Sequence, residues 1–278
     1  MVRELEGRGY EVAGWDRPEV DITDAAAVEK ALGDFCPEVV YNAAAYNQVD
    51  VAEQEPDAAF QVNALAVRNL AVVCRQMDVP LIHYSTDYVF DGFASRPYTE
   101  QDHTHPLGAY GGSKLAGELY AQAYLDRVLI VRTSGVVGVG GLNTARGNFV
   151  EVMLRLAGSG NPIRVVADNY ASPAFAPPLA ARTVDLVEGG HFGVFHCGAG
   201  APYSWFEFAK LIFEAAGLQP TLQATDAREY RTPARRPRFS ALSNARMESA
   251  GIQPMPPLKQ ALEAYFAQRA KVVTAKPA

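Results

Sequence analysis

The sequence has little of what several classes of protein require. Its 278 residues include only three cysteines, Cys36, Cys74 and Cys197, whose spacing matches neither a disulfide framework nor a metal site. No apolar run approaches the ~18–20 residues that span a bilayer, and the N-terminus lacks the apolar core of a signal peptide. The net charge of −6 argues against binding to nucleic acids or anionic membranes. We therefore expect a cytoplasmic globular protein without a metal site, a nucleic-acid partner or a membrane partner.

A glycine-rich turn is also missing. A dinucleotide-binding sheet opens with a strand, a glycine-rich turn and a helix. This chain opens with MVRELEGRGYEV, which reads as the end of that helix running into the next strand. We therefore expect roughly twenty further residues before this start in the complete protein; a fold that never had the strand is the alternative. Backbone N–H groups of such a turn bind the pyrophosphate, so we expect this chain to bind a dinucleotide poorly.

What the chain does have is a regular alternation of short apolar segments and amphipathic segments. Four segments are typical of buried strands: residues 10–16, 37–45, 79–86 and 127–135. Helical patterns separate them, which predicts an α/β protein with a Rossmann-type doubly wound parallel sheet and helices on both faces. We expect a dinucleotide-binding domain over residues 1–134. Residues 135–278 should form mainly a smaller substrate-binding domain, with some segments returning to the first, and Ser204 and Glu207 should form a capping box.

Two stretches suggest chemistry, HYSTDYVFDG at residues 83–92 and YGGSK at residues 110–114. Tyr110 and Lys114 are four residues apart and so share one helix face. An ammonium near a phenol should lower the pKa of Tyr110, which would suit Tyr110 to protonate a carbonyl oxygen as hydride reaches its carbon. Thr86, at a strand end, can hydrogen-bond the same oxygen, and Lys114 can also hold a ribose hydroxyl. A surface pair is the alternative for Tyr110 and Lys114, and we interpret His83 as structural.

The order of these motifs resembles the extended short-chain dehydrogenases/reductases and, more closely, the dTDP-4-dehydrorhamnose reductase family. The resemblance extends from about residue 39 to 215 and rests on YNAAAYNQVDVAEQEPDAAFQVNALAVRNLA, IHYSTDYVFDG, PLGAYGGSKLAGE, RTSGVVG, GNFVEVMLRLA and SWFEFA. ARRPRFSAL extends it further. The resemblance implies an oxidoreductase of dTDP-rhamnose biosynthesis. Such an enzyme reduces the 4-keto group of dTDP-4-dehydro-L-rhamnose to dTDP-L-rhamnose with NADPH or NADH, and a homodimer is possible.

The resemblance also implies roles for individual residues. It makes Tyr110, Lys114 and Thr86 the catalytic set, and Thr86 and Asp87 sugar contacts. Cofactor contacts are then expected at Asp21, Ile22, Ala43, Ala44, Ala45, Tyr46, Asn63, Ser85, Tyr110 and Lys114. Asp21 and Ile22 flank the adenine, residues 43–46 run beside the ribose and pyrophosphate, and Asn63 supports that loop.

Four further residues have two interpretations each. Asp16 can bind the adenosine ribose diol and favour NAD, whereas Arg17 can meet a 2′-phosphate and favour NADP; an ordinary turn pair is the alternative. Arg236 offers a fork-shaped guanidinium to a nucleotide-sugar diphosphate or lies in a solvated basic loop. Asn148 touches the sugar nucleotide or caps a helix.

The sequence departs from the family pattern at positions that affect the substrate. Gly135 stands where a substrate-facing tryptophan is expected, DNYASPA at residues 168–174 replaces the pattern DQxGxPT, and Asn47 replaces a frequent threonine. The exact sugar therefore stays open, and a reductase or epimerase for another nucleotide sugar is an alternative. A non-catalytic NAD(P)-binding homologue, similar to the regulatory subunits of methionine adenosyltransferase, is another. The intact Thr–Tyr–Lys set argues against it, and the missing glycine turn argues for it.

Overall fold

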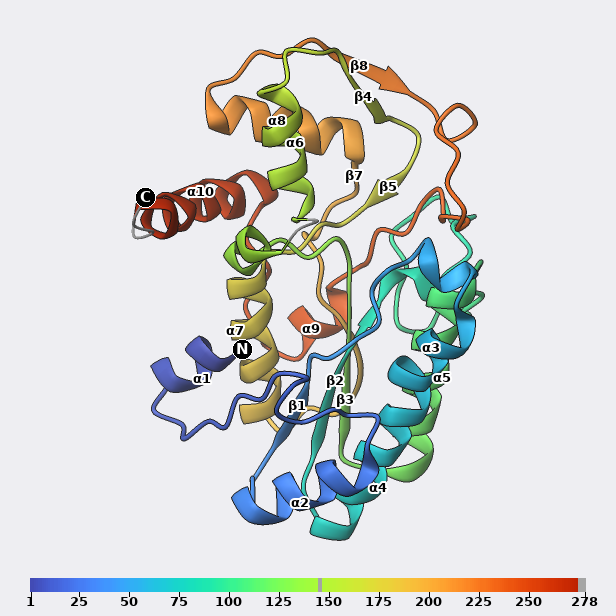
Figure 1. Ribbon diagram of the computed structural model, residues 1–278, viewed down its shortest axis with the longest axis vertical. Helices are drawn as coiled ribbons and strands as arrows, with labels where there is room; N and C mark the ends of the chain where they lie inside the picture. The colour runs from blue at the N-terminus through green and yellow to red at the C-terminus, as the bar shows by residue number, and fades with distance from the viewer. Residues whose placement is uncertain (145–146, 275–278) are drawn as a thin grey trace.

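The computed structural model describes residues 1–144 and 147–274. A parallel sheet of four strands forms the larger layer (Figure 1), in the order β1 (Val40–Asn42), β2 (Leu81–Thr86), β3 (Val128–Thr133) and β6 (Gly193–His196). Because the strands are parallel, their carboxyl ends meet at one edge of the sheet. Within these described residues, no helix is both long and apolar enough to cross a membrane.

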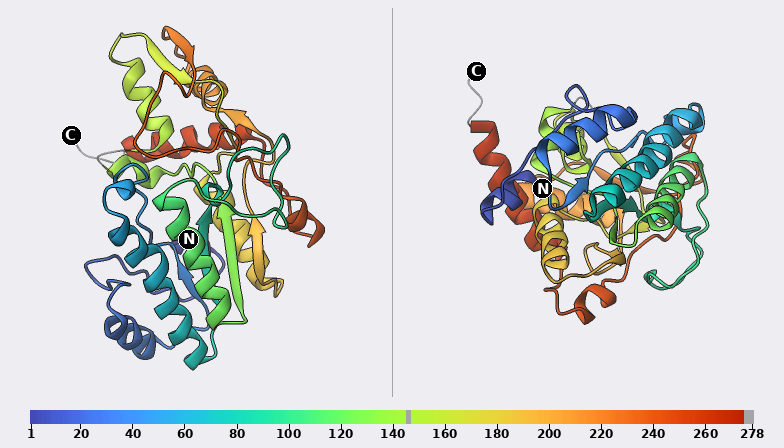
Figure 2. Two further views of the ribbon diagram at one scale, coloured as in Figure 1. Left: turned by 90° about the vertical axis from the view of Figure 1, so that its right-hand side faces the viewer. Right: turned by 90° about the horizontal axis from the view of Figure 1, so that it is seen from below.

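Helices cover both faces of this sheet (Figure 2). One face carries α2 (Ala25–Phe35), α4 (Ala66–Met77) and α5 (Ala109–Tyr124), and the other carries α7 (Ala176–Glu188). Side chains alternate along each strand, so Leu81 and Ile130 join the core under α4, whereas Ile82 and Leu129 join the core under α7. This arrangement confirms the predicted doubly wound α/β fold.

The smaller layer lies beyond the carboxyl ends of the strands. It contains α6 (Phe149–Ala157), β4 (Ile163–Val166), α8 (Trp205–Ala216), β8 (Leu222–Thr225) and α10 (Leu258–Thr274). Phe208, Ile212 and Leu262 are fully buried in its core. Ser204 and Glu207 form the predicted capping box at the start of α8. Although β6 and α7 belong to the second half of the chain, they lie in the larger layer, and the domain boundary after residue 134 stays a prediction.

Short elements complete the chain. They are α1 (Val2–Gly7), α3 (Pro56–Phe60), α9 (Ala245–Ser249), the strands β5 (Tyr170–Ala171) and β7 (Tyr203–Ser204), the 3₁₀ helices Val51–Glu53, Asp87–Val89 and Val139–Asn143, and a π-helical turn, Gln61–Leu65.

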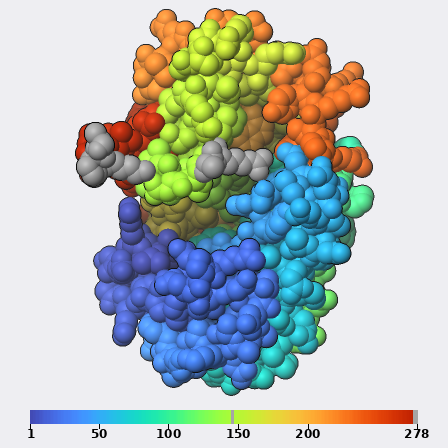
Figure 3. Space-filling view, viewed as in Figure 1, coloured from blue at the N-terminus to red at the C-terminus, as the bar shows by residue number. Residues whose placement is uncertain are grey.

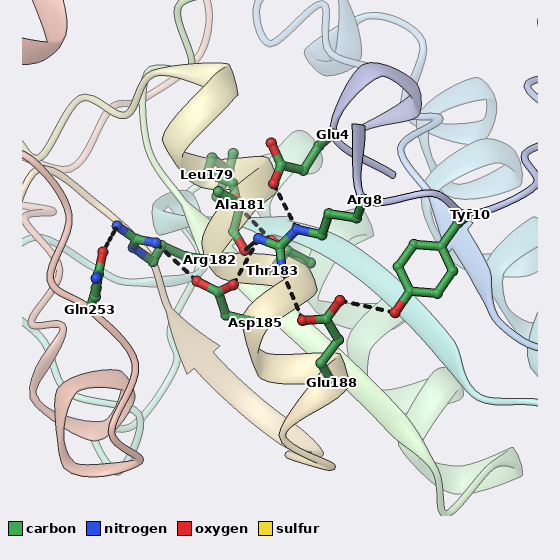
Figure 4. Close-up of polar contacts among 10 residues, drawn as sticks. All are labelled: Glu4, Arg8, Tyr10, Leu179, Ala181, Arg182, Thr183, Asp185, Glu188 and Gln253. Carbon is green, nitrogen blue, oxygen red and sulfur yellow. Dashed lines mark hydrogen bonds and ion pairs between the residues drawn. The ribbon is translucent and has the colours of Figure 1, made fainter. Parts of the chain in front are cut away.

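The strand predicted at residues 10–16 is wrong, because that segment pairs with no described strand. A strand forms only where an adjacent strand satisfies its backbone N–H and C=O groups. Side chains anchor this part of the chain instead, as Figure 4 shows. Arg8 donates to Asp185 and to Glu188 of α7, both at 2.8 Å, and the Tyr10 hydroxyl donates to Glu188 at 2.9 Å. The N-terminal segment is therefore docked on α7 rather than paired in the sheet.

Candidate active site

The predicted catalytic residues meet at the carboxyl edge of the sheet. Thr86 is the last residue of β2 and pairs in register with Thr133, the last residue of β3. Tyr110 lies in the first turn of α5, which packs against β2. The molecular surface is hollowed where the larger layer meets the smaller one (Figure 3). Open α/β sheets bind their ligands at this edge, so the fold brings the two hydroxyl groups to the expected place.

The Thr86 hydroxyl lies close enough to the Tyr110 phenol to affect its pKa. Burial raises the pKa of Tyr110 to about 12, the nearby Asp87 carboxylate acts in the same direction, and the Thr86 hydroxyl opposes them. The ring of Tyr88 packs edge-on against Tyr110, with 5.9 Å between the ring centres. The prediction that the pKa of Tyr110 is lowered is wrong for this structure, because burial dominates and the head group of Lys114 contacts the Tyr84 oxygen and His83 instead.

Lys114 is buried below the site, with only 2% of its surface exposed. Its Nζ donates to the main-chain oxygen of Tyr84 at 2.6 Å and lies 3.3 Å from Nε2 of His83. Burial lowers the pKa of Lys114 to about 8, and the charge of Glu118 opposes that shift. A lysine head group has three donor positions, so one direction stays available for a ligand hydroxyl.

Asp87 ties the site to the C-terminal part of the chain. Its carboxylate accepts hydrogen bonds from the hydroxyls of Ser134 at 2.8 Å, Ser240 at 2.5 Å and Thr86 at 3.1 Å. Burial raises its pKa to about 6, while these three hydroxyls act in the opposite direction. Both carboxylate oxygens are thus used inside the protein, and the sugar contact expected for Asp87 stays a prediction.

The loop that follows β1 is fixed in place by hydrogen bonds from a side chain of the π-helical turn, Asn63. Asn63 accepts from the Tyr46 N–H at 2.9 Å and donates to the Tyr46 oxygen at 3.0 Å and to Ser113 at 3.0 Å. The loop's small side chains, Ala43, Ala44 and Ala45, are exposed at the carboxyl edge. Single π-helical turns are frequent at functional sites, and here the turn positions Asn63 to fix a loop that a cofactor can approach closely.

The structure gives Ser85 an internal partner. Its hydroxyl donates to the Glu118 carboxylate, which forms a buried ion pair with Arg132. The cofactor contact expected for Ser85 stays a prediction.

The residues expected near the adenosine form a surface turn. Arg17 pairs with Asp21 at 3.1 Å, and the Asp16 N–H donates to the Glu19 carboxylate at 2.8 Å. Ile22 packs on the core between α2 and the sheet. The cofactor roles of Asp16, Arg17, Asp21 and Ile22 stay predictions.

Asn148 caps a helix. Its Oδ1 accepts from the Glu151 N–H at 3.1 Å, and its Nδ2 donates to the Gly138 oxygen at 3.0 Å and to the Tyr265 hydroxyl at 3.2 Å. The structure thus shows the capping role, and the sugar contact stays a prediction.

Arg236 holds a bidentate ion pair with Asp50, at 3.0 and 2.8 Å. The Tyr88 side chain lies near this ion pair. Arg236 therefore stabilises the wall of the site, and its contact with a diphosphate stays a prediction.

A small pocket opens beside Tyr110. Glu53, Tyr88, Gly108 and Arg235 line it, together with Ala234 and Pro237 from the C-terminal part of the chain. The Glu53 carboxylate accepts from the Ala109 N–H at 2.7 Å and so fixes the start of α5. Sequence reasoning missed Glu53 because its partner is a backbone group far along the chain, and no local pattern signals such a contact.

Gly135 adopts a backbone conformation that suits glycine. Its φ is +49°, and a Cβ at this position would lie 3.0 Å from the ring of Trp205. A tryptophan here would have a strained backbone and would crowd Trp205. The local backbone conformation therefore favours glycine over the tryptophan of the family pattern.

A doubly wound sheet with a threonine at the end of one strand, and a tyrosine and a lysine on the helix packed against it, defines the class of nucleotide-dependent short-chain oxidoreductases. The model of the RmlD substrate binding domain matches residues 1–271. A dTDP-4-dehydrorhamnose reductase from Aggregatibacter actinomycetemcomitans is 37% identical, over 88% of this chain and 86% of the relative. The chain belongs to this family of dTDP-4-dehydrorhamnose reductases.

Two further comparisons bear on the cofactor and the substrate. The crystal structure of a dTDP-4-dehydrorhamnose reductase from Bacillus anthracis, in complex with NADP, superposes with a TM-score of 0.91 at 32% identity, and covers 96% of this chain and 93% of that one. A dTDP-4-keto-6-deoxy-D-glucose reductase from Streptomyces niveus is 35% identical, over 92% of this chain and 88% of the relative.

Proposed function

We propose that this protein reduces the 4-keto group of dTDP-4-dehydro-L-rhamnose to dTDP-L-rhamnose with a nicotinamide cofactor. One observation carries the proposal: the side chains of Thr86 and Tyr110 interact at the carboxyl edge of the sheet, and Lys114 of the same helix as Tyr110 is buried. The family supplies the substrate class, since its curated members are named for dTDP-sugar reduction.

The protein's own residues supply the proton and orient the substrate. A pKa of about 12 keeps the Tyr110 phenol protonated at neutral pH, so its proton is available to the oxygen of the keto group. Thr86 donates a hydrogen bond to the same oxygen and stabilises its developing charge. Arg235, whose exposed side chain borders the small pocket beside Tyr110, can meet the nucleotide diphosphate with its guanidinium.

The residues near the site fit the ribose end of a dinucleotide. The exposed alanines of residues 43–45 leave room beside the sheet edge, Asn63 fixes that loop, and Lys114 has one donor direction left for a ribose hydroxyl. When bound, the cofactor supplies the hydride. NADP is favoured over NAD because a solved relative binds NADP and because the Arg17 side chain is 82% exposed and can meet a 2′-phosphate.

The test is an assay of cofactor oxidation with dTDP-4-dehydrorhamnose, run with NADPH and with NADH over a wide range of cofactor concentrations. Cofactor binding is measured separately by NADPH fluorescence, so that weak binding and absent chemistry are distinguished. Turnover that produces dTDP-rhamnose supports the proposal. Bound cofactor without turnover contradicts it.

A second candidate is the reduction of another dTDP-4-keto sugar. The observation that favours it is Gly135, whose backbone conformation excludes the bulky side chain that the family carries there. A panel of dTDP-4-keto sugars in the same assay separates the two candidates by their kcat/KM values. A homodimer stays a prediction, which light scattering after gel filtration can test.

A further inference from the structure

His83 is buried in the sheet directly below the candidate site. It lies on β2, has no exposed surface, and pairs in register with Asn42 of β1. Its Nδ1 is 3.2 Å from Nδ2 of Asn42, and its Nε2 is 3.3 Å from Nζ of Lys114. The imidazole therefore joins an amide on one strand to the lysine of the catalytic set.

The orientation of the Asn42 amide determines where the His83 proton is. Oδ1 of Asn42 accepts from the Ala44 N–H at 3.1 Å, which leaves Nδ2 to donate toward Nδ1 of His83. A ring nitrogen that accepts a hydrogen bond carries no proton, so the proton of a neutral imidazole is then on Nε2. Burial holds the pKa of His83 well below its usual value, and any charge on Lys114 acts in the same direction, so the ring stays neutral.

An Nε2–H group faces Nζ of Lys114 in this tautomer. An N–H can donate only to a lone pair, which a neutral amine has and an ammonium lacks. Nζ also donates to the Tyr84 oxygen at 2.6 Å. A neutral Lys114 can satisfy both neighbours, accepting from His83 and donating to Tyr84, and one N–H is left to point at the site.

We propose that Asn42 and His83 are positioning residues that set the protonation of Lys114: Asn42 fixes the Nε2–H tautomer of His83, and that tautomer favours the neutral amine of Lys114. The proposal deepens the proposed function, because it gives Lys114 an adjustable charge beside Tyr110. Glu118 of α5 acts in the opposite direction, since its charge favours the ammonium. That carboxylate is itself paired with Arg132 of β3.

The tautomer can be observed without any turnover. Nitrogen-15 NMR of the histidine rings distinguishes Nε2–H from Nδ1–H, and the His83 signals are assigned by their loss in His83→Gln. The proposal predicts Nε2–H in the wild-type protein. Detection of the Nδ1–H tautomer would overturn it, whether or not the protein reduces a sugar, so this test is independent of the proposed function.

Two variants then test the effect on Lys114. In Asn42→Asp, the carboxylate can accept from both Ala44 and His83, which forces the Nδ1–H tautomer and lets Nε2 accept from an ammonium. In His83→Gln, the amide oxygen can turn toward Nζ and accept in the same way. Both variants should raise the pKa of Lys114 by roughly one unit or more, measured by carbon-13 NMR titration of the lysine Cε signals.

The matched control is His103→Gln, on an exposed loop, which should leave the titration of Lys114 unchanged. Far-UV circular dichroism confirms that each variant is folded, and either variant alone suffices if the other does not fold. An unchanged Lys114 titration in a folded Asn42→Asp or His83→Gln protein contradicts the proposal.

Discussion

The buried ion pair between Glu118 and Arg132 lies directly behind the candidate site, and removing its negative charge should be costly. The exposed fractions of the two side chains are 1% and 6%. Arg132 donates to both carboxylate oxygens, at 3.0 Å and 3.2 Å from Nε and at 2.6 Å from Nη2. Ser85 donates to the same carboxylate. Glu118→Gln keeps the shape of the side chain but turns an N–H donor toward the arginine donors.

The size of the effect follows from what the variant leaves behind. Among the residues that the structure describes, Nη1 of Arg132 already has no hydrogen-bond partner. Glu118→Gln would also leave the buried guanidinium without the carboxylate that balances its charge. Loss of one partner of a buried pair typically costs about 3–5 kcal/mol. For a protein of this size, that corresponds to a fall in Tm of roughly 10 °C.

Urea unfolding followed by circular dichroism measures the change in the free energy of unfolding. The double variant Glu118→Gln with Arg132→Met is the matched control, because it removes the stranded charge and should recover part of the loss. Ser85→Ala, which removes one hydrogen bond to the charged group, should lose only about 1.5–3 kcal/mol. A single Glu118→Gln variant within about 1 kcal/mol of the wild type, or a double variant no more stable than the single one, would refute the reasoning.

The structure also predicts how a change of pH and two glycine substitutions in α5 alter the free energy of unfolding. Burial raises the pKa of Asp87 from 3.8 to about 6, so the folded protein binds this proton more tightly than the unfolded chain. The free energy of unfolding therefore falls by up to about 3 kcal/mol as pH rises from about 4 to about 6, and Asp87→Asn should remove that fall in urea titrations run at several pH values. Gly117→Ala would place a Cβ 2.1 Å from the main-chain oxygen of Asn63, so α5 must shift and the free energy of unfolding should drop by at least about 2 kcal/mol. Gly112→Ala, on the same helix, is the control: its Cβ would make an ordinary contact of 3.8 Å with the ring of Phe60. This variant should have the stability of the wild type or be more stable by up to about 1 kcal/mol.

Much of the larger layer could be predicted from the sequence, because buried parallel strands and amphipathic helices have distinct periodicities. The segment at residues 10–16 has a strand-like pattern but forms no strand. The pattern describes which side chains are apolar, whereas a strand also needs a neighbour for its backbone. Local patterns such as the capping box of Ser204 and Glu207 were predicted correctly because all the atoms involved lie within one turn.

The sequence predicted correctly that Tyr110 and Lys114 lie on one helix, but it did not predict the electrostatics around them. The spacing of Tyr110 and Lys114 places both on α5, yet it does not show where the lysine head group points. That direction is set by β2, through the Tyr84 oxygen and the ring of His83. Burial then raises the pKa of Tyr110 to about 12, opposite to the direction expected from a neighbouring ammonium. Contacts between distant segments decide such shifts, and one sequence contains no signal for them.

The central claim is that the Tyr110 phenol delivers the proton to the keto oxygen. Its most direct test is the single-turnover rate of sugar reduction by Tyr110→Phe, measured with the affinity for the cofactor. The account predicts a rate lower by roughly 10²–10⁴-fold with cofactor affinity and fold unchanged. Tyr84→Phe loses the hydroxyl of a ring that packs in the core under α7, on the opposite face of the sheet, and it should retain the wild-type rate. An unchanged rate in Tyr110→Phe would contradict the account.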